Sequence, residues 1–149
     1  MTGLLLDTML GRLATYLRMC GYDTAYALDE SLESDDTLLE YARDTDRTIL
    51  TRDRELARRY EDSLLLESRE ITDQLQEVAD AGYTLELPET PTRCGVCNGT
   101  LTQIPPDTQT PAYAPDPVAV ECWQCEDCGQ FFWKGSHWDD VAETLASID

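Results

Sequence analysis

Apolar residues alternate between short runs and helical stripes over the first 82 residues. Residues 3–6 (GLLL) predict a short buried strand, and the segment behind them carries an apolar stripe that ends at Gly21. The stripe consists of Met9, Leu10, Leu13, Leu17 and Cys20. We therefore expect a strand followed by a helix that buries this stripe, with Cys20 serving as a small buried hydrophobe.

The same alternation continues along the chain. Strands are predicted at residues 22–28 (YDTAYAL), 47–51 (RTILT) and 63–68 (SLLLES), and helices at residues 35–44, 53–61 and 71–82. Strands that alternate with helices form a mainly parallel sheet with helices packed on it. The pattern therefore predicts an α/β fold with a mainly parallel sheet flanked by helices.

From about Leu87 the pattern changes. Residues 88–93 (PETPTR) are typical of a linker, and the segment after them is rich in Cys, Pro, Gly and aromatic residues with little helical periodicity. We expect an α/β domain at residues 1–88, a small cysteine module at 93–138 with a Pro-rich insert, and a short C-terminal helix or tail at 139–149.

The net charge of the chain bears on which molecules it can bind. Thirty Asp and Glu residues stand against eleven Lys and Arg, the net charge is −19, and Lys134 is the single lysine. Such a surface repels polyanions. This composition resembles that of proteins from halophilic archaea, whose molar salt screens charge over about 3 Å; the alternative is an ordinary acidic protein that prefers Arg.

The N-terminal apolar run predicts no signal peptide, because Asp7 interrupts it after Leu6, and no segment is long enough to predict a membrane span. We expect a cytoplasmic protein without a membrane partner. In that compartment the six cysteines favour metal ligands or free thiols over disulfides.

Two CxxC pairs lie in the cysteine module, Cys94 with Cys97 and Cys125 with Cys128. Each has a glycine close behind it that permits a tight turn, and four thiolates suit tetrahedral zinc. The interval between the pairs exceeds the usual roughly 15–20 residues, and the Pro-rich insert at 104–117 accounts for the excess. A closed set of four sulfurs leaves no position for water, so this zinc is predicted to be structural.

Cys122 forms a competing CxxC pair with Cys125. We favour Cys125 with Cys128 because Gly129 follows that pair directly.

The only histidine, His137, lies between two tryptophans. We interpret it first as a member of an aromatic cluster, ahead of a site residue or a zinc ligand.

Three aspartates lie where a predicted strand gives way to a helix: Asp7, Asp35 and Asp53. Taken singly, each is a favoured helix N-cap. All strand-to-helix connections of a parallel sheet lie at its carboxyl edge, so we expect the three carboxylates to converge there. Clustered negative charges are costly without a cation, and Mg²⁺ or Mn²⁺ prefers such ligands. The predicted chemistry is metal-assisted attack of water on phosphate.

Four segments carry a resemblance to a known family: LLLDTMLGRLATYLRMCGYDT, SDDTLLEYARDTDRTILTRDRELA, RCGVCNG and CEDCGQFFWKGSHW. From about Leu4 to Trp138 the chain resembles the Mut7-C family, a PIN-like ribonuclease domain with a C-terminal zinc ribbon. The resemblance implies a metal-dependent nuclease acting on RNA, with Asp7, Asp35 and Asp53 as its clustered acids. Cys122 departs from the ribbon pattern of that family.

Further residues near the acidic edge receive accessory roles. The resemblance implies Asp36 as an extra ligand and Thr51 as a residue that orients Asp53 or a metal-bound water, with a simple strand-end role as the alternative for Thr51. Arg12, Arg52 and Arg54 are candidates for binding phosphates bidentately. The alternative for these arginines is ion pairing on an acidic surface.

Other features of the sequence bear on two alternative functions. A non-catalytic RNA- or ribosome-binding module would use aromatic residues for base stacking, although so small a module also needs them for its core. These residues are Trp123, Phe131, Trp133 and Trp138. A phosphatase or phosphoacceptor is disfavoured, because such sites usually recruit a lysine and Lys134 lies in the ribbon. For the predicted metal-dependent ribonuclease, the expected partner is RNA. The ribosome or other RNA-processing proteins are further candidates.

Overall fold

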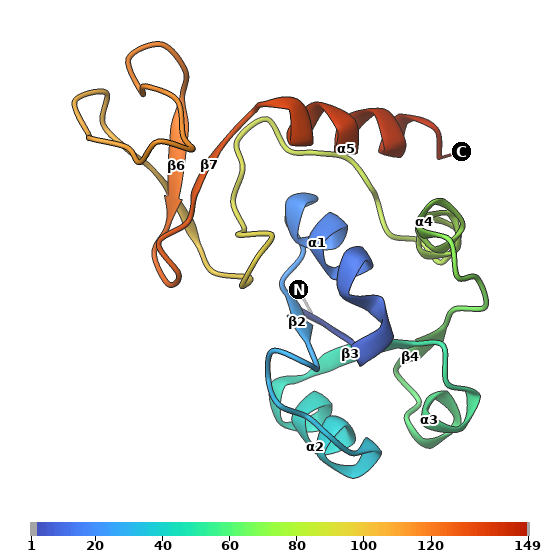
Figure 1. Cartoon of the computed structure of the whole chain (residues 1–149). Coiled ribbons are helices and arrows are strands. Elements are labelled where there is room, and N and C mark those ends of the chain that lie inside the picture. The colour runs from blue at the N-terminus through green and yellow to red at the C-terminus, as the bar shows by residue number, and fades with distance from the viewer. Residues whose placement is uncertain (1–2, 149) are drawn as a thin grey trace.

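The computed structural model describes residues 3–148, which form a four-stranded parallel sheet and a three-stranded antiparallel sheet (Figure 1). The parallel sheet has the order β2-β1-β3-β4 and the antiparallel sheet the order β5-β6-β7. The strands are β1 (Gly3–Leu6), β2 (Thr24–Tyr26), β3 (Arg47–Thr51), β4 (Ser63–Leu65), β5 (Leu101–Gln103), β6 (Cys122–Cys125) and β7 (Phe131–Trp133). The predicted α/β fold with a parallel sheet and a small cysteine-bearing ribbon is confirmed.

Helices cover both faces of the parallel sheet. The helices are the 3₁₀ turn η1 (Thr8–Leu10), α1 (Gly11–Met19), α2 (Asp35–Thr45), α3 (Arg54–Arg59), α4 (Ile71–Asp80) and α5 (Ser136–Ala146). α1 and α4 lie on one face, and α2 and α3 lie on the other (Figure 1). Because both faces are buried, the central strand β1 is almost entirely apolar: Leu4 and Leu6 face α1, and Leu5 faces α2.

The strand order places a topological switch between β1 and β3. The chain leaves β1 through α1 to reach β2 on one side, and then returns through α2 to β3 on the other side. In the register Leu6 lies opposite both Tyr26 and Leu50, so the carboxyl ends of the three strands are level. Ligands of open α/β sheets bind at such a switch point.

The predicted elements differ from the structure in several details. The strands predicted at 22–28 and 63–68 are shorter, spanning Thr24–Tyr26 and Ser63–Leu65. Met9 was expected on the buried stripe, but it is 59% exposed because η1 precedes α1 and turns this side chain outward. The C-terminal segment, predicted as a helix or tail from residue 139, is a helix that begins at Ser136. Its residues Val141 and Leu145 belong to the core on the α1 face, so α5 leaves the ribbon and packs against α4.

Each CxxC pair with the turn behind it forms a knuckle, the first around Cys94 and Cys97 and the second around Cys125 and Cys128. Polar contacts fasten the first knuckle to the α/β domain. Arg18 of α1 is almost fully buried, and its Nη1 donates to the carbonyls of Gly95 (3.2 Å) and Val96 (3.1 Å). The side chain of Asn98 accepts from the backbone N–H of Thr24 (2.9 Å) and donates to Asp23 (2.8 Å). The ribbon therefore sits in a defined position against α1 and β2.

No helix within residues 3–148 has the length and apolar character required to cross a membrane.

Candidate active site and metal centre

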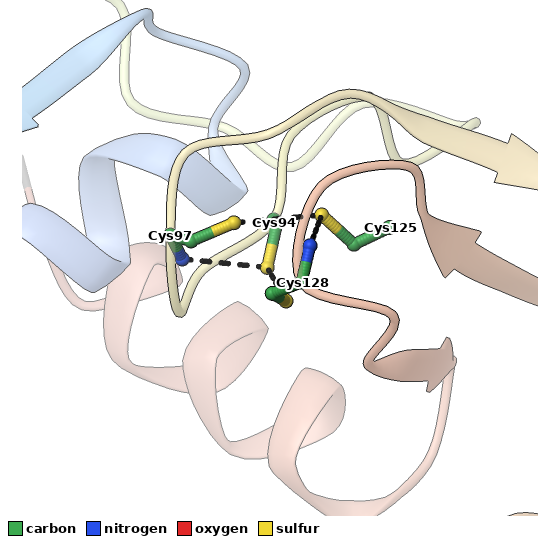
Figure 2. A group of neighbouring side chains, drawn as sticks. All are labelled: Cys94, Cys97, Cys125 and Cys128. Atoms are coloured by element: carbon green, nitrogen blue, oxygen red, sulfur yellow. Dashed lines mark hydrogen bonds between the residues drawn. The ribbon is translucent and has the colours of Figure 1, made fainter.

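Four cysteine sulfurs gather at the junction of the two knuckles (Figure 2). The four Sγ atoms lie within 4.8 Å of one another; Cys94 is 3.7 Å from Cys128, and Cys97 is 3.5 Å from Cys125. These separations are far longer than the roughly 2.05 Å of a disulfide. They approach the roughly 3.8 Å expected between thiolates bound to one tetrahedral zinc at about 2.3 Å. The donor set therefore fits zinc.

Each knuckle points backbone N–H groups at a sulfur. Cys97 N donates to Cys94 Sγ, and the N–H groups of Asp127 and Cys128 donate to Cys125 Sγ, each at 3.4 Å. Burial raises the pKa of Cys94 and of Cys97. Burial acts the same way on Cys125, but the N–H donors outweigh it and lower the pKa to about 7. A thiolate at Cys125 is therefore accessible at neutral pH.

A glycine was expected to form the tight turn behind each CxxC pair, and only the second turn uses one in this way. In the first knuckle Asn98 takes the left-handed conformation (φ 73°), whereas in the second Gly129 does so (φ 79°). Gly99 is needed for space, because a Cβ there would lie 2.6 Å from Cys125 Sγ. The two knuckles close around the sulfurs only with these small residues behind them.

The other two cysteines and the histidine lie outside this cluster. Cys122 is buried, and its Sγ lies 3.3 Å from the carbonyl oxygen of Val120. Cys20 is partly buried rather than fully buried, and burial raises its pKa to about 12. His137 is exposed in the first turn of α5. The structure thus groups the four cysteines that the sequence favoured.

Asp7 and Asp53 are connected through one buried hydroxyl group at the switch point. Thr51 Oγ1 donates to Asp7 Oδ2 (2.7 Å) and accepts from the backbone N–H of Asp53 (3.0 Å). Asp7 Oδ1 caps η1 through Thr8 N (2.7 Å), and Asp53 Oδ1 caps α3 through Glu55 N (2.9 Å). Both aspartates are helix caps, and Thr51 also joins them across the ends of β1 and β3.

Asp35 and Asp36 have different neighbours. Ser34, not Asp35, is the N-cap of α2, through a capping box with Thr37. Asp36 forms an ion pair with Arg59, and the hydrogen bond that Arg59 donates to Asp36 raises the pKa of Arg59, with the charge of Asp35 adding to the effect. Among residues 3–148, the four cysteines are the only group of three or more Cys, His, Asp or Glu side chains arranged to hold a metal ion. Convergence of all three aspartates on one ion therefore stays a prediction.

The candidate phosphate-binding arginines divide into two kinds. Arg54 pairs with Glu67 at 3.3 Å on the surface, as expected for an acidic protein. Arg12 is exposed and has no ion pair within residues 3–148. Arg52 has a buried Nε without a hydrogen-bond partner, and it lines a small pocket of about 200 Å³ beside the acidic edge. Binding of an anion by one of these arginines stays a prediction.

Tyr26 and Asp29 also lie at this edge, and the sequence reasoning missed them. Tyr26 donates its hydroxyl to the carbonyl of Thr8 (2.6 Å). Burial raises the pKa of Tyr26, and the carboxylates of Asp29 and Asp7 raise it further, so all three side chains share one region. Asp29 follows the predicted strand at 22–28 directly, and the strand-end rule that selected Asp7 would also have selected it.

These features define a class of protein: an α/β domain with an aspartate after each of the two strands at its sheet switch point, joined to a ribbon whose four cysteines could hold a metal ion. The Mut7-C RNAse domain matches residues 2–145, so the chain belongs to the Mut7-C RNAse domain family. The resemblance stated from the sequence is thereby confirmed over nearly the whole chain, and the match supports a ribonuclease-like function with RNA as substrate. The search of curated proteins and the search of solved structures returned no match.

Proposed function

We propose that the chain hydrolyses RNA phosphodiester bonds with the help of a divalent cation, Mg²⁺ or Mn²⁺, bound by Asp7 and Asp53 and completed by Asp35. The observation that carries the proposal is the Thr51 hydroxyl at the switch point of the sheet, which bonds to the carboxylate of Asp7 and to the backbone N–H of Asp53. When bound, the cation would supply a more acidic water and would stabilise the charge on the leaving oxygen.

Hydrogen bonds orient the aspartates of the proposed site and leave carboxylate oxygens free for a cation. Asp7 is oriented at both oxygens, by Thr8 N and by Thr51 Oγ1. A carboxylate has about four lone-pair positions, so each oxygen of Asp7 keeps capacity for a cation. Within residues 3–148, both hydrogen bonds to the Asp53 side chain end on Oδ1, and Oδ2 accepts none. Arg52 is proposed to bind the phosphate that the aspartates alone would repel.

Zinc has a separate role in this proposal. The four cysteines would saturate its coordination and leave no open position for water or substrate. The knuckle that holds Cys94 and Cys97 contacts α1 through Arg18. Zinc is therefore proposed to fix the ribbon beside the nuclease site.

The test compares Asp7→Asn with the parent protein on labelled single-stranded RNA with Mn²⁺ at high salt. Asn is about as good an N-cap as Asp, so the variant should keep its fold while losing a charge. We expect cleavage to fall at least about 100-fold. Asp44→Asn is the matched control, because Asp44 is an exposed carboxylate on α2 away from the strand ends. Equal cleavage by parent and Asp7→Asn would rule out this site.

A non-catalytic RNA- or ribosome-binding module is the second candidate. It is favoured by Phe131, Trp133 and Trp138, which are only partly buried and line a cleft, whereas Trp123 is buried in the ribbon core. Stable RNA binding without cleavage in any divalent ion would support this candidate against the nuclease.

A further inference from the structure

A cleft of about 500 Å³ separates the α/β domain from the ribbon. One wall comes from α1, from Tyr26 at the end of β2 and from Asp29 in the turn after it, and the other comes from β7 and the first turn of α5. Its volume lies in the range of sites that enclose small molecules or single groups of a polymer. The contacts of Arg18 with the first knuckle set the distance between these walls.

Aromatic rings on the ribbon wall are held in place by Tyr113. Phe131 and Trp133 are two residues apart on β7, so they lie on the same side of that strand. Tyr113 from the Pro-rich insert packs against both rings, at centroid distances of 6.4 Å and 6.2 Å, and its hydroxyl accepts from Phe131 N (3.1 Å). Trp138 adds a third partly exposed ring. Such rings offer ordered surfaces for stacking.

The carboxylate of Asp29 is a hydrogen-bond acceptor in the opposite wall of the cleft. Asp29 has a half-exposed carboxylate, and Arg18 Nη2 lies 3.5 Å from its Oδ2. Arg18 cannot follow a moving carboxylate, because its Nε also donates to the Thr24 carbonyl (2.9 Å). A carboxylate in this position can accept the exocyclic amino N–H of a base, as carboxylates do from cytosine N4.

The cleft opens beside the proposed catalytic edge. Tyr26 lines the cleft and donates its hydroxyl to Thr8, the residue after Asp7. A group bound in the cleft would therefore lie close to a phosphate at Asp7.

The charge of the chain limits how RNA can be bound. Most RNA- and DNA-binding proteins gain affinity by releasing counterions from phosphates, and that gain weakens with salt. A chain with a net charge of −19 lacks this source of affinity. Stacking and hydrogen bonds to bases depend less on salt and remain available.

We propose that this cleft binds an unpaired nucleobase of single-stranded RNA, stacked on the rings of β7 and α5 and donating an amino N–H to Asp29. The inference rests on the proposed ribonuclease function and identifies the recognised form of its substrate as unpaired RNA. Duplex RNA, whose bases are already stacked and paired, is excluded from the cleft.

The experiment measures binding separately from cleavage. The zinc-loaded full chain carrying Asp7→Asn is titrated into a fluorescently labelled single-stranded RNA octamer, and anisotropy is recorded at 0.2 and 2 M KCl, concentrations chosen to span roughly 7 to 2 Å of screening length. We expect Trp133→Leu and Trp138→Leu each to weaken binding about tenfold. We expect the affinity of the unchanged cleft to fall less than about threefold between the two salts.

Tyr41→Leu is the matched control, because Tyr41 lies on α2 against the opposite face of the sheet. It should leave RNA affinity unchanged. Zinc content and the thermal midpoint of each variant verify folding; if Trp133→Leu loses zinc, Trp138→Leu on α5 alone decides the comparison. An octamer with abasic sites should bind at least about tenfold more weakly than the parent octamer.

Equal affinity for the abasic octamer, or unchanged affinity in a folded Trp138→Leu variant, would overturn the proposal. Failure of the proposed nuclease function gives a different result, namely no cleavage by the parent chain with any divalent ion while the cleft variants still lose RNA affinity.

Discussion

Thr51 joins the two aspartates of the proposed active site through a single buried hydroxyl group. The side chain is fully buried at the end of β3, donates to Asp7 and accepts from the Asp53 N–H. The strand-end rule located both aspartates from sequence, because it depends only on where apolar runs stop. The link between them depends on strand order and register, which local periodicity does not contain.

Thr51→Val tests the link, because valine keeps the volume and removes both hydrogen bonds. We expect a loss of about 1–2 kcal/mol in the free energy of unfolding and roughly a tenfold fall in kcat with little change in KM, as for residues that orient ligands. Thr48→Val is the matched control: Thr48 is also buried on β3 but donates to Asp62 (2.9 Å). A similar fall in kcat for both variants would contradict a positioning role for Thr51.

Asp23 gives the junction between knuckle and α/β domain a pH dependence. Burial alone would raise the pKa of Asp23, but hydrogen bonds from Asn98 and Arg47 lower it below its ordinary value. A depressed carboxyl pKa stabilises the fold above the unfolded value of about 4, and this contribution disappears as pH falls through the lower folded value.

Asp23→Asn is therefore expected to cost about 1 kcal/mol at pH 7, a small figure because the side chain is 40% exposed. Urea unfolding at pH 7 and pH 3 measures it. The difference between parent and variant should shrink at pH 3, and a difference that grows there would contradict the assigned pKa direction.

At the scale of elements, the βα alternation was predictable because each element has its own hydrophobic period. The exceptions required tertiary contacts: η1 turns Met9 outward, and α5 packs Val141 and Leu145 on the core of a domain distant in sequence. The docking of the first knuckle on α1 was equally hidden, because local periodicity does not distinguish Arg18 from an exposed arginine on a helix. Arg18 is buried because its guanidinium bonds to the carbonyls of Gly95, Val96 and Thr24.

The pairing of the second knuckle is testable by zinc content. Cys128→Ser removes a sulfur from the cluster, so we expect most of the zinc to be lost and the thermal midpoint to fall. Cys122→Ser is the matched control and should retain one zinc per chain, because Cys122 lies outside the cluster. Zinc loss in Cys122→Ser together with retention in Cys128→Ser would reverse the assignment.

At the scale of the whole molecule, the α/β domain and the ribbon line a common cleft near the carboxyl edge of the parallel sheet. The α/β domain supplies Asp7 and Asp53, the ribbon supplies aromatic rings, and the arrangement is held by Arg18 and by α5. The sequence identified the parts, since motifs and strand ends are local. It did not locate the cleft, because a cavity between modules depends on how they pack.

The most direct measurement of the central claim is an anomalous difference map from a crystal of the full chain soaked in Mn²⁺, recorded on both sides of the manganese absorption edge. We predict a manganese peak in contact with the carboxylates of Asp7 and Asp53, distinct from zinc at the cysteine cluster. A fully soaked crystal without manganese at these two aspartates would contradict the proposed site and leave both residues as helix caps.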